Sequence, residues 1–138
     1  MQRLIDLYIR GIDFCIKHDY PTLDFIRENF KGKCEPYGVW VDERVYLRNV
    51  DRLVLEGDCT GEIEYDGFSV SRLFLRHNST IKVKASQYAI VTIESFDSSH
   101  LDLVVAGSKA RVCVVLYGDS TVNATGNVQI VKKNKKTY

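Results

Sequence analysis

The chain after residue 48 carries a regular pattern of short apolar alternations. Pairs of apolar residues separated by one residue recur about every ten positions. Glycine, aspartate, asparagine and serine lie between the pairs, and no proline follows Pro36. Alternation with a period of two is typical of β-strands, so the pattern predicts a series of short strands joined by tight turns. The pairs are Leu53/Leu55, Ile63/Tyr65, Leu73/Leu75, Ile81/Val83, Val91/Ile93, Leu101/Leu103, Val112/Val114 and Val122/Ala124, followed by Ile130.

The residues that point away from these pairs separate the strands into two sets. Counted from the strand of Leu53, the even strands expose mainly polar residues: Glu62, Glu64, Lys82, Lys84, Asp102, Asn123 and Thr125. The odd strands expose mainly apolar residues, with Arg52, Arg72 and Arg76 as exceptions: Val54, Phe74, Ile90, Cys113, Val115 and Tyr117. Alternate strands of a two-sided solenoid stack on opposite faces, whereas a meander mixes the sets in one sheet. The pattern therefore predicts a mainly β protein, a small two-sided parallel β-solenoid with about ten residues per strand-turn unit. An antiparallel β-sandwich is the alternative.

The first 48 residues have a different, mainly helical pattern. Residues 3–17 are expected to form an amphipathic helix that buries one stripe: Leu4, Tyr8, Ile12, Cys15 and Ile16. A second helix is expected to start near Asp19 or Thr22, and short strands near 39–41 and 45–47. We therefore expect a helical head with short linking strands over 1–48 and a β-repeat region over 49–138, in one compact unit. The head either caps the first coil or folds over the apolar face, in its own chain or in another.

Composition and charge narrow the function. The chain has 138 residues, is 45% hydrophobic and carries a net charge of +1. It shows no membrane-length apolar run, no secretory signal pattern and no cysteine or histidine spacing typical of zinc sites. These observations predict an intracellular protein with no membrane partner, no metal and no cofactor. The balanced charge argues against nucleic acid as a partner.

Candidate chemistry is confined to the turns and the C-terminal tail. Arg76, His77, Asp97, His100 and Asp119 lie near predicted turns, where solvated turn residues are the expected role. No phosphate-binding or nucleophile motif is present, so we expect no catalytic residues. The alternative is a solenoid enzyme or carbohydrate binder that uses the edge with His77, Asp97 and His100. A second alternative is a regulator that binds an acidic partner through a basic tail, composed of Lys132, Lys133, Lys135 and Lys136.

Two segments resemble a loose group of short-repeat proteins. Residues 77–85 (HNSTIKVKA) and 117–126 (YGDSTVNATG) are similar to rungs of uncharacterised β-solenoid proteins of bacteriophages and bacterial mobile elements. The resemblance covers about residues 49–131 and brings no catalytic residues with it. It implies a phage or mobile-element accessory protein, with a virion-associated location as the alternative to an intracellular one. Together with the apolar set of outward residues, it leads to the hypothesis of a non-enzymatic structural or protein-interaction module. The expected partner is another protein or a second copy, bound through Val54, Phe74, Ile90, Cys113, Val115 and Tyr117.

Overall fold

The computed structural model describes residues 2–137 and begins with three short helices. These are α1 (Gln2–Arg10), α2 (Ile12–His18) and α3 (Leu23–Asn29). The Thr22 hydroxyl accepts a hydrogen bond from the Phe25 backbone N–H (3.3 Å) and so caps α3 at its N-terminus. A 3-10 turn (Glu35–Tyr37) then leads into the strands. The helical head is thus confirmed, with the first expected helix divided between α1 and α2.

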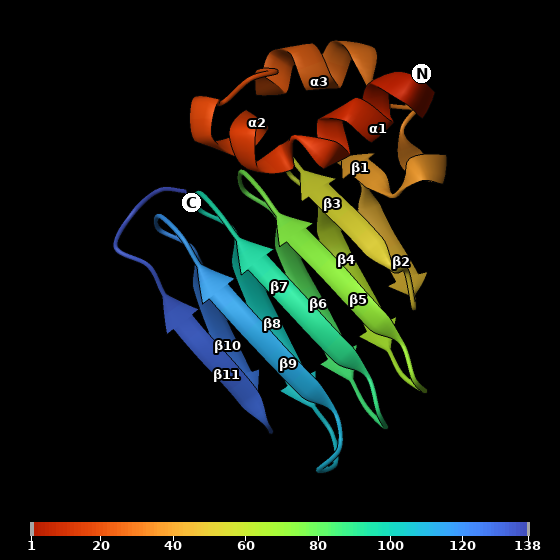
Figure 1. Cartoon of the computed structure of the whole chain (residues 1–138), viewed down its shortest axis with the longest axis vertical. Helices are drawn as coiled ribbons and strands as arrows, with labels where there is room; N and C mark the ends of the chain where they lie inside the picture. The colour runs from red at the N-terminus through yellow and green to blue at the C-terminus, as the bar shows by residue number, and fades with distance from the viewer. Residues whose placement is uncertain (1, 138) are drawn as a thin grey trace.

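Eleven strands follow among the described residues, and they form two sheets (Figure 1). Sheet A has the order β1-β3-β5-β7-β9-β11, and sheet B has the order β10-β8-β6-β4-β2. Odd and even strands are therefore sorted into different sheets, as the outward residues predicted. The strands are β1 (Val39–Val41), β2 (Arg44–Arg48), β3 (Arg52–Glu56), β4 (Thr60–Tyr65), β5 (Val70–Leu75), β6 (Thr80–Ala85), β7 (Ile90–Ser95), β8 (His100–Val105), β9 (Arg111–Leu116), β10 (Thr121–Thr125) and β11 (Val128–Lys132).

Every strand pairing in the two sheets is parallel. Leu53 lies opposite Leu73, which in turn lies opposite Ile93 in the next coil. In sheet B, Ile63 lies opposite Val83 in the same way. Parallel pairing of strands one coil apart defines the two-sided parallel β-solenoid, and the antiparallel sandwich is therefore wrong.

The interior of the solenoid is filled by the apolar pairs of both sheets, which are fully buried from Leu53 to Leu116. One row of corners is occupied by small residues, Cys59, Ser79, Ser99 and Ser120. The Ser99 and Ser120 hydroxyls donate to the backbone carbonyl three residues earlier, at 2.6 and 2.7 Å. These hydrogen bonds satisfy polar groups that burial would otherwise leave unpaired.

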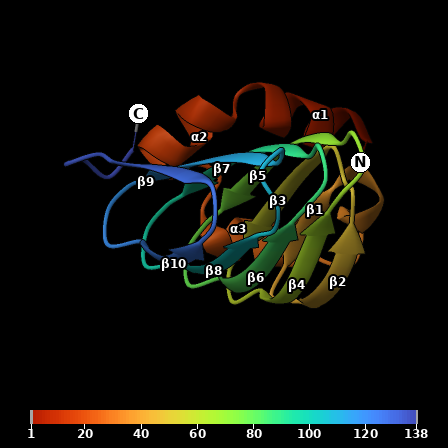
Figure 2. The same cartoon turned by 90° about the horizontal axis from the view of Figure 1, so that it is seen from below.

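The helical head lies over the end of sheet A to which its strands point (Figure 1), with α1 and α2 on the side away from sheet B (Figure 2). It packs against β1 through Val39 and Val41 and also covers part of β3 and β5. Ile5 and Ile9 belong to the buried stripe of α1, whereas Leu4 is exposed. Of the predicted stripe, Tyr8, Ile12 and Ile16 are buried and Cys15 is half-buried, so the prediction is wrong only at Leu4, which lies on a second apolar face of α1 and α2.

The last coil leaves one end of the solenoid open. Ile130 of β11 lies opposite the buried Val114 and therefore points inward, yet it is 47% exposed because no further coil covers it. Lys132 lies opposite Leu116, so its charged side chain follows the same inward column. An inward lysine on an edge strand opposes the addition of another strand.

Candidate functional site

The residues predicted to form an interface lie on the outer face of sheet A but have different surroundings. Val54, Phe74 and Tyr117 are buried in a cluster with the helices of the head, and Val115 packs partly buried against it. Cys113 is half-buried in the neighbouring outward column. Ile90 remains 48% exposed, beyond the cover of the head. In this structure the head of the same chain thus covers the end of the face that carries Val54, Phe74 and Tyr117, and Ile90 stays open.

A buried polar cluster fastens the head to this face. The Tyr8 hydroxyl of α1 donates to Glu56 Oε1, and Arg76 Nη1 donates to the same oxygen at 3.0 Å. Arg76 Nη1 also lies 2.9 Å from the Tyr8 hydroxyl oxygen, and Arg76 Nη2 lies 3.6 Å from Asp19 Oδ1. Tyr8, Glu56 and Arg76 are all nearly inaccessible to solvent. The cluster joins residues 8, 56 and 76 across the boundary between head and coil.

The ionisation of this cluster follows from its burial. Burial raises the pKa of the Glu56 carboxyl, and the Arg76 guanidinium offsets only part of that rise. Burial lowers the pKa of Arg76, but Tyr8 and Glu56 raise it by more, so its pKa lies above the ordinary value. Arg76 therefore keeps its charge. Two polar atoms of the cluster, Glu56 Oε2 and Arg76 Nε, have no hydrogen-bond partner. The cluster is enclosed and its polar groups face one another, so its role is structural.

His77 and Asp97, the candidates for acid–base chemistry, form a ladder between turns. Both residues have positive φ angles, 62° and 59°, at the same position of successive coils. His77 Nδ1 accepts a hydrogen bond from the Gly57 N–H at 3.0 Å, and Asp97 Oδ2 accepts one from the His77 N–H at 2.9 Å. Each side chain thus satisfies a backbone donor of the preceding coil. The hydrogen bond of Asp97 is to the backbone of His77 and does not involve the imidazole ring.

The environment of His77 leads to a prediction about pH. Burial, followed by the nearby Arg76 charge, lowers the pKa of His77 to about 4. An unfolded histidine titrates near pH 6.5, about 2.5 units higher, so protons bind the unfolded chain first as the pH falls. The contribution of His77 to stability is complete above about pH 6.5 and is lost towards pH 4, with a slope of up to about 1.4 kcal/mol per pH unit.

The variant His77→Asn should flatten this slope. Asparagine tolerates positive φ and keeps an oxygen acceptor for Gly57, but it does not titrate. Urea unfolding at several pH values between 7 and 4 measures the effect, with His18→Asn at an exposed histidine as the control. An unchanged slope in His77→Asn would contradict the role of His77.

The remaining turn candidates lie apart from this ladder. His100 belongs to β8 of sheet B, where its Nδ1 lies 2.6 Å from Thr121 Oγ1 and its Nε2 lies 3.2 Å from Asp102 Oδ1. Asp119 is exposed in the turn before β10. The predicted edge is therefore divided, because Asp97 accepts from the backbone of His77, whereas His100 lies against Thr121 and Asp102.

The basic tail is attached to the last coil by its backbone. The Lys133 N–H donates to the Leu116 carbonyl at 2.9 Å, and the Lys135 carbonyl accepts from the Gly118 N–H at 3.0 Å. The four lysine side chains of the tail are exposed. The tail thus extends the pairing of β11 with the end of β9, and its charges face solvent.

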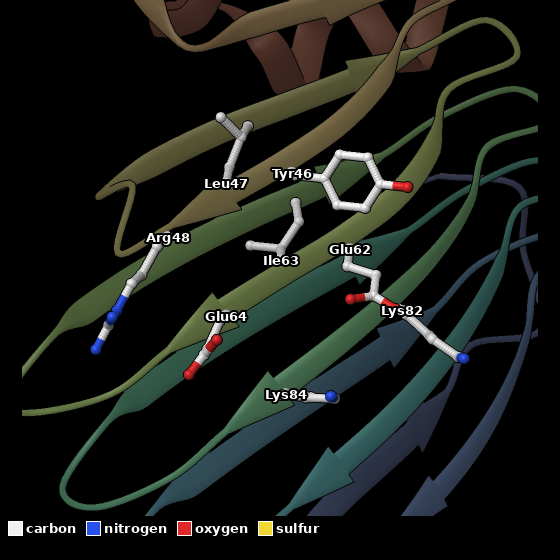
Figure 3. A pocket seen from close by; sticks show the side chains of 8 residues that line it. All are labelled: Tyr46, Leu47, Arg48, Glu62, Ile63, Glu64, Lys82 and Lys84. Carbon is white, nitrogen blue, oxygen red and sulfur yellow. The ribbon is translucent and has the colours of Figure 1, made fainter.

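The outer face of sheet B carries a ladder of alternating charges (Figure 3). Glu62 and Glu64 lie opposite Lys82 and Lys84, and Lys82 lies opposite Asp102 in the next coil. Opposite charges directly across a ladder stabilise the pairing of neighbouring strands. The shallow hollow here, of about 240 Å³, contains near-balanced charge and favours neither anions nor cations.

An apolar groove in the head is the surface whose chemistry points most clearly to a partner. Its volume is about 360 Å³, and it is open to solvent between α1–α2 and α3. Leu7, Phe14 and Tyr20 contribute the most exposed apolar side chains, at 59%, 58% and 67%. The groove is lined by Leu4, Leu7, Tyr8, Gly11, Phe14, Cys15, Tyr20, Pro21, Phe25 and Phe30. Clustered exposed apolar side chains of this kind mark interaction sites.

A second apolar patch lies at the turns before β5 and β7. The exposed rings of Phe68 and Tyr88 are stacked, with centroids 4.9 Å apart and an interplanar angle of 8°. Val70 and Ile90 lie opposite each other beside the rings and are also exposed. Ile90 is the one residue of the predicted interface that belongs to such an open patch.

The sequence analysis missed the groove, although a signal was present. Leu4, Leu7, Gly11 and Phe14 are spaced three, four and three residues apart, which places them on one helical face. It also missed Glu56, which occupies in β3 the register position that Arg76 has one coil later. The available signal was that an acid, Glu56, and a base, Arg76, lie twenty residues (one coil) apart among the apolar outward residues.

Two further observations concern metals and membranes. No group of three or more histidine, cysteine, aspartate or glutamate side chains within 2–137 is arranged to hold a metal ion. None of the helices in that range is long and apolar enough to cross a membrane.

Burial raises the pKa of the Cys34 thiol to about 12, so this cysteine stays protonated at neutral pH.

The two stacked parallel sheets place the protein in the class of two-sided parallel β-solenoids. Its helical head covers one end of sheet A. Comparison of the chain with protein-family models, curated proteins and solved structures found no significant match. The resemblance to solenoid proteins of phages and mobile elements therefore stays a prediction.

Proposed function

We propose that this protein is a non-enzymatic protein-interaction module that binds its partner through the groove of the helical head. The observation that carries the proposal is the concentration of exposed apolar side chains, Leu7, Phe14 and Tyr20 among them, around one concave surface. Burial of such side chains against a partner removes apolar area from water, which is the main driving force of association. The solenoid serves as the rigid support of the head.

The arrangement of polar residues supports a function without catalysis. Glu56 and Arg76 hold the head on the sheet, and His77 and Asp97 hold successive turns together. None of these groups faces the apolar groove as a reactive side chain. A role as an accessory protein of a phage or mobile element, inside the cell or in the virion, accords with the resemblance of the rungs at 77–85 and 117–126.

Selection of binding peptides tests the proposal. A displayed library of peptides is enriched on the wild-type protein, and each enriched peptide is then measured on Phe14→Glu and Tyr46→Glu. Tyr46 is a suitable control because it is 62% exposed, like Phe14, but lies on sheet B. Peptides that bind the wild type and Tyr46→Glu at equal affinity should bind Phe14→Glu at least about tenfold more weakly, as expected for a charge placed in an apolar contact.

Two results would contradict the proposed function. One is enrichment of no peptide at all at a protein concentration at which the chain is monomeric. The other is enrichment only of peptides that bind Phe14→Glu as tightly as the wild type, which would place the binding surface elsewhere.

A further inference from the structure

The exposed stripe of the head has the spacing of a helix–helix contact. Leu4, Leu7, Gly11 and Phe14 follow one another at intervals of three, four and three residues. Hydrogen bonding continues through the junction of α1 and α2, because the Gly11 N–H donates to the Leu7 carbonyl (3.1 Å) and the Cys15 N–H donates to the Gly11 carbonyl (2.9 Å). The four residues therefore form one continuous stripe along both helices.

Gly11 lies at the centre of this stripe, although no contact within the chain requires a glycine there. Its φ of −105° is accessible to any residue, and a Cβ at this position would meet only the Leu7 carbonyl oxygen, at an ordinary 3.5 Å. Alanine is more favourable than glycine within helical turns, so the fold of one copy favours alanine here. A glycine does allow a second backbone to approach closely, which is an advantage only in a complex.

The two banks of the groove carry opposite charges. On the α1–α2 side, the exposed Arg3, Arg10 and Lys17 recur every seven residues beside the apolar stripe and outnumber the two acids of these helices, Asp6 and Asp13. On the α3 side, Asp24 and Glu28 are exposed and lie four residues apart. A two-fold axis that runs along the groove places the basic bank of one copy over the acidic bank of the other. The surface around the groove is thus complementary to itself in polarity and charge.

We infer that the occupant of the groove is the same groove of a second copy, in a two-fold symmetric dimer with the helices crossing near Gly11. This inference rests on the proposed function and names its partner. A closed two-fold contact of one surface with itself is the commonest form of oligomer among soluble proteins. In the dimer, the stripes of the two copies pack together and each row of basic side chains faces Asp24 and Glu28 of the partner.

Sedimentation equilibrium across a concentration series tests the inference. The wild-type protein and Tyr46→Glu should dimerise with equal affinity, whereas Leu7→Glu should be a monomer. Gly11→Ala should leave the thermal unfolding of the monomer unchanged or raise its midpoint, but weaken dimerisation at least about tenfold, because an added methyl group overpacks a close contact. A wild-type protein that stays monomeric up to about 0.5 mM overturns the inference, and so does a Gly11→Ala protein that dimerises as tightly as the wild type.

Reversal of the charged banks tests the orientation. Arg10→Glu with Lys17→Glu reverses one bank, and Asp24→Lys with Glu28→Lys reverses the other. Each reversal alone should weaken dimerisation, and all four changes in one chain should restore it, since the banks again have opposite signs. Failure of the fourfold variant to recover overturns the two-fold arrangement. If the wild-type protein is monomeric and the binding of its selected peptides still depends on Phe14, the dimer is contradicted but the proposed function is supported.

Discussion

Replacement of Glu56 by alanine should lower the free energy of unfolding by about 3–5 kcal/mol. The substitution removes the carboxylate that accepts from Tyr8 and from Arg76, both of them buried. The guanidinium of Arg76 then remains charged without a buried counter-ion, and Asp19 at 3.6 Å is exposed and contributes only a weak attraction. Chemical denaturation followed by circular dichroism measures the loss.

A double variant separates the cost of an unpaired charge from the value of the pair itself. Glu56→Leu combined with Arg76→Met replaces the ion pair by apolar side chains of similar volume, a change that is often neutral or stabilising in other proteins. The double variant should therefore recover most of the stability that Glu56→Ala loses. A loss below about 1 kcal/mol in Glu56→Ala would show that the pair does not hold the head in place.

Phe74→Ala should cost about 3–5 kcal/mol, the range for truncation of a large buried aromatic side chain. Phe74 is 1% exposed and belongs to the cluster that joins sheet A to the head. The Arg72 guanidinium lies over its ring at 4.6 Å from the centroid and adds a second contact. Removal of the ring leaves a cavity under the helices that the rigid sheet cannot fill.

Ile90→Ala provides the matched control for Phe74. Ile90 projects from the same face of sheet A, but it is 48% exposed and no helix covers it. We expect its truncation to cost less than about 1 kcal/mol. Fluorescence of Trp40, the one tryptophan of the chain, follows unfolding of the first coil, and far-ultraviolet circular dichroism follows the whole chain. Equal losses in Phe74→Ala and Ile90→Ala would contradict the placement of the head.

The repeat region was predictable because its pattern is local and recurs in every coil. Alternation within each strand locates the buried pairs, such as Leu53/Leu55, and the structure buries them as expected. The contrast between the outward residues of odd and even strands predicted that these strands are sorted into two sheets, as the structure shows. Each coil contacts mainly its neighbours, so the regularity of the sequence and the regularity of the structure coincide.

The chemistry of the turns was less accessible to sequence reasoning. His77 and Asp97 were recognised as turn residues, yet their hydrogen bonds join different coils. The acceptor of the Gly57 N–H is twenty residues away and depends on the register of stacking. A pattern within one turn carries no information about that register.

The strand positions, the two-sided coil and the helical head were predictable from the sequence, because they follow from periodicities of apolar and polar residues along the chain. The packing of the head on the end of sheet A in the same chain, and the exposure of Leu4 and Leu7, depend on the assembled fold. Two apolar stripes on α1 and α2 compete for the sheet, and the choice is made by distant contacts such as that of Tyr8 with Glu56 and Arg76. Those contacts form only when the coil is assembled, since the stacking of β3 on β5 is what brings Glu56 and Arg76 together.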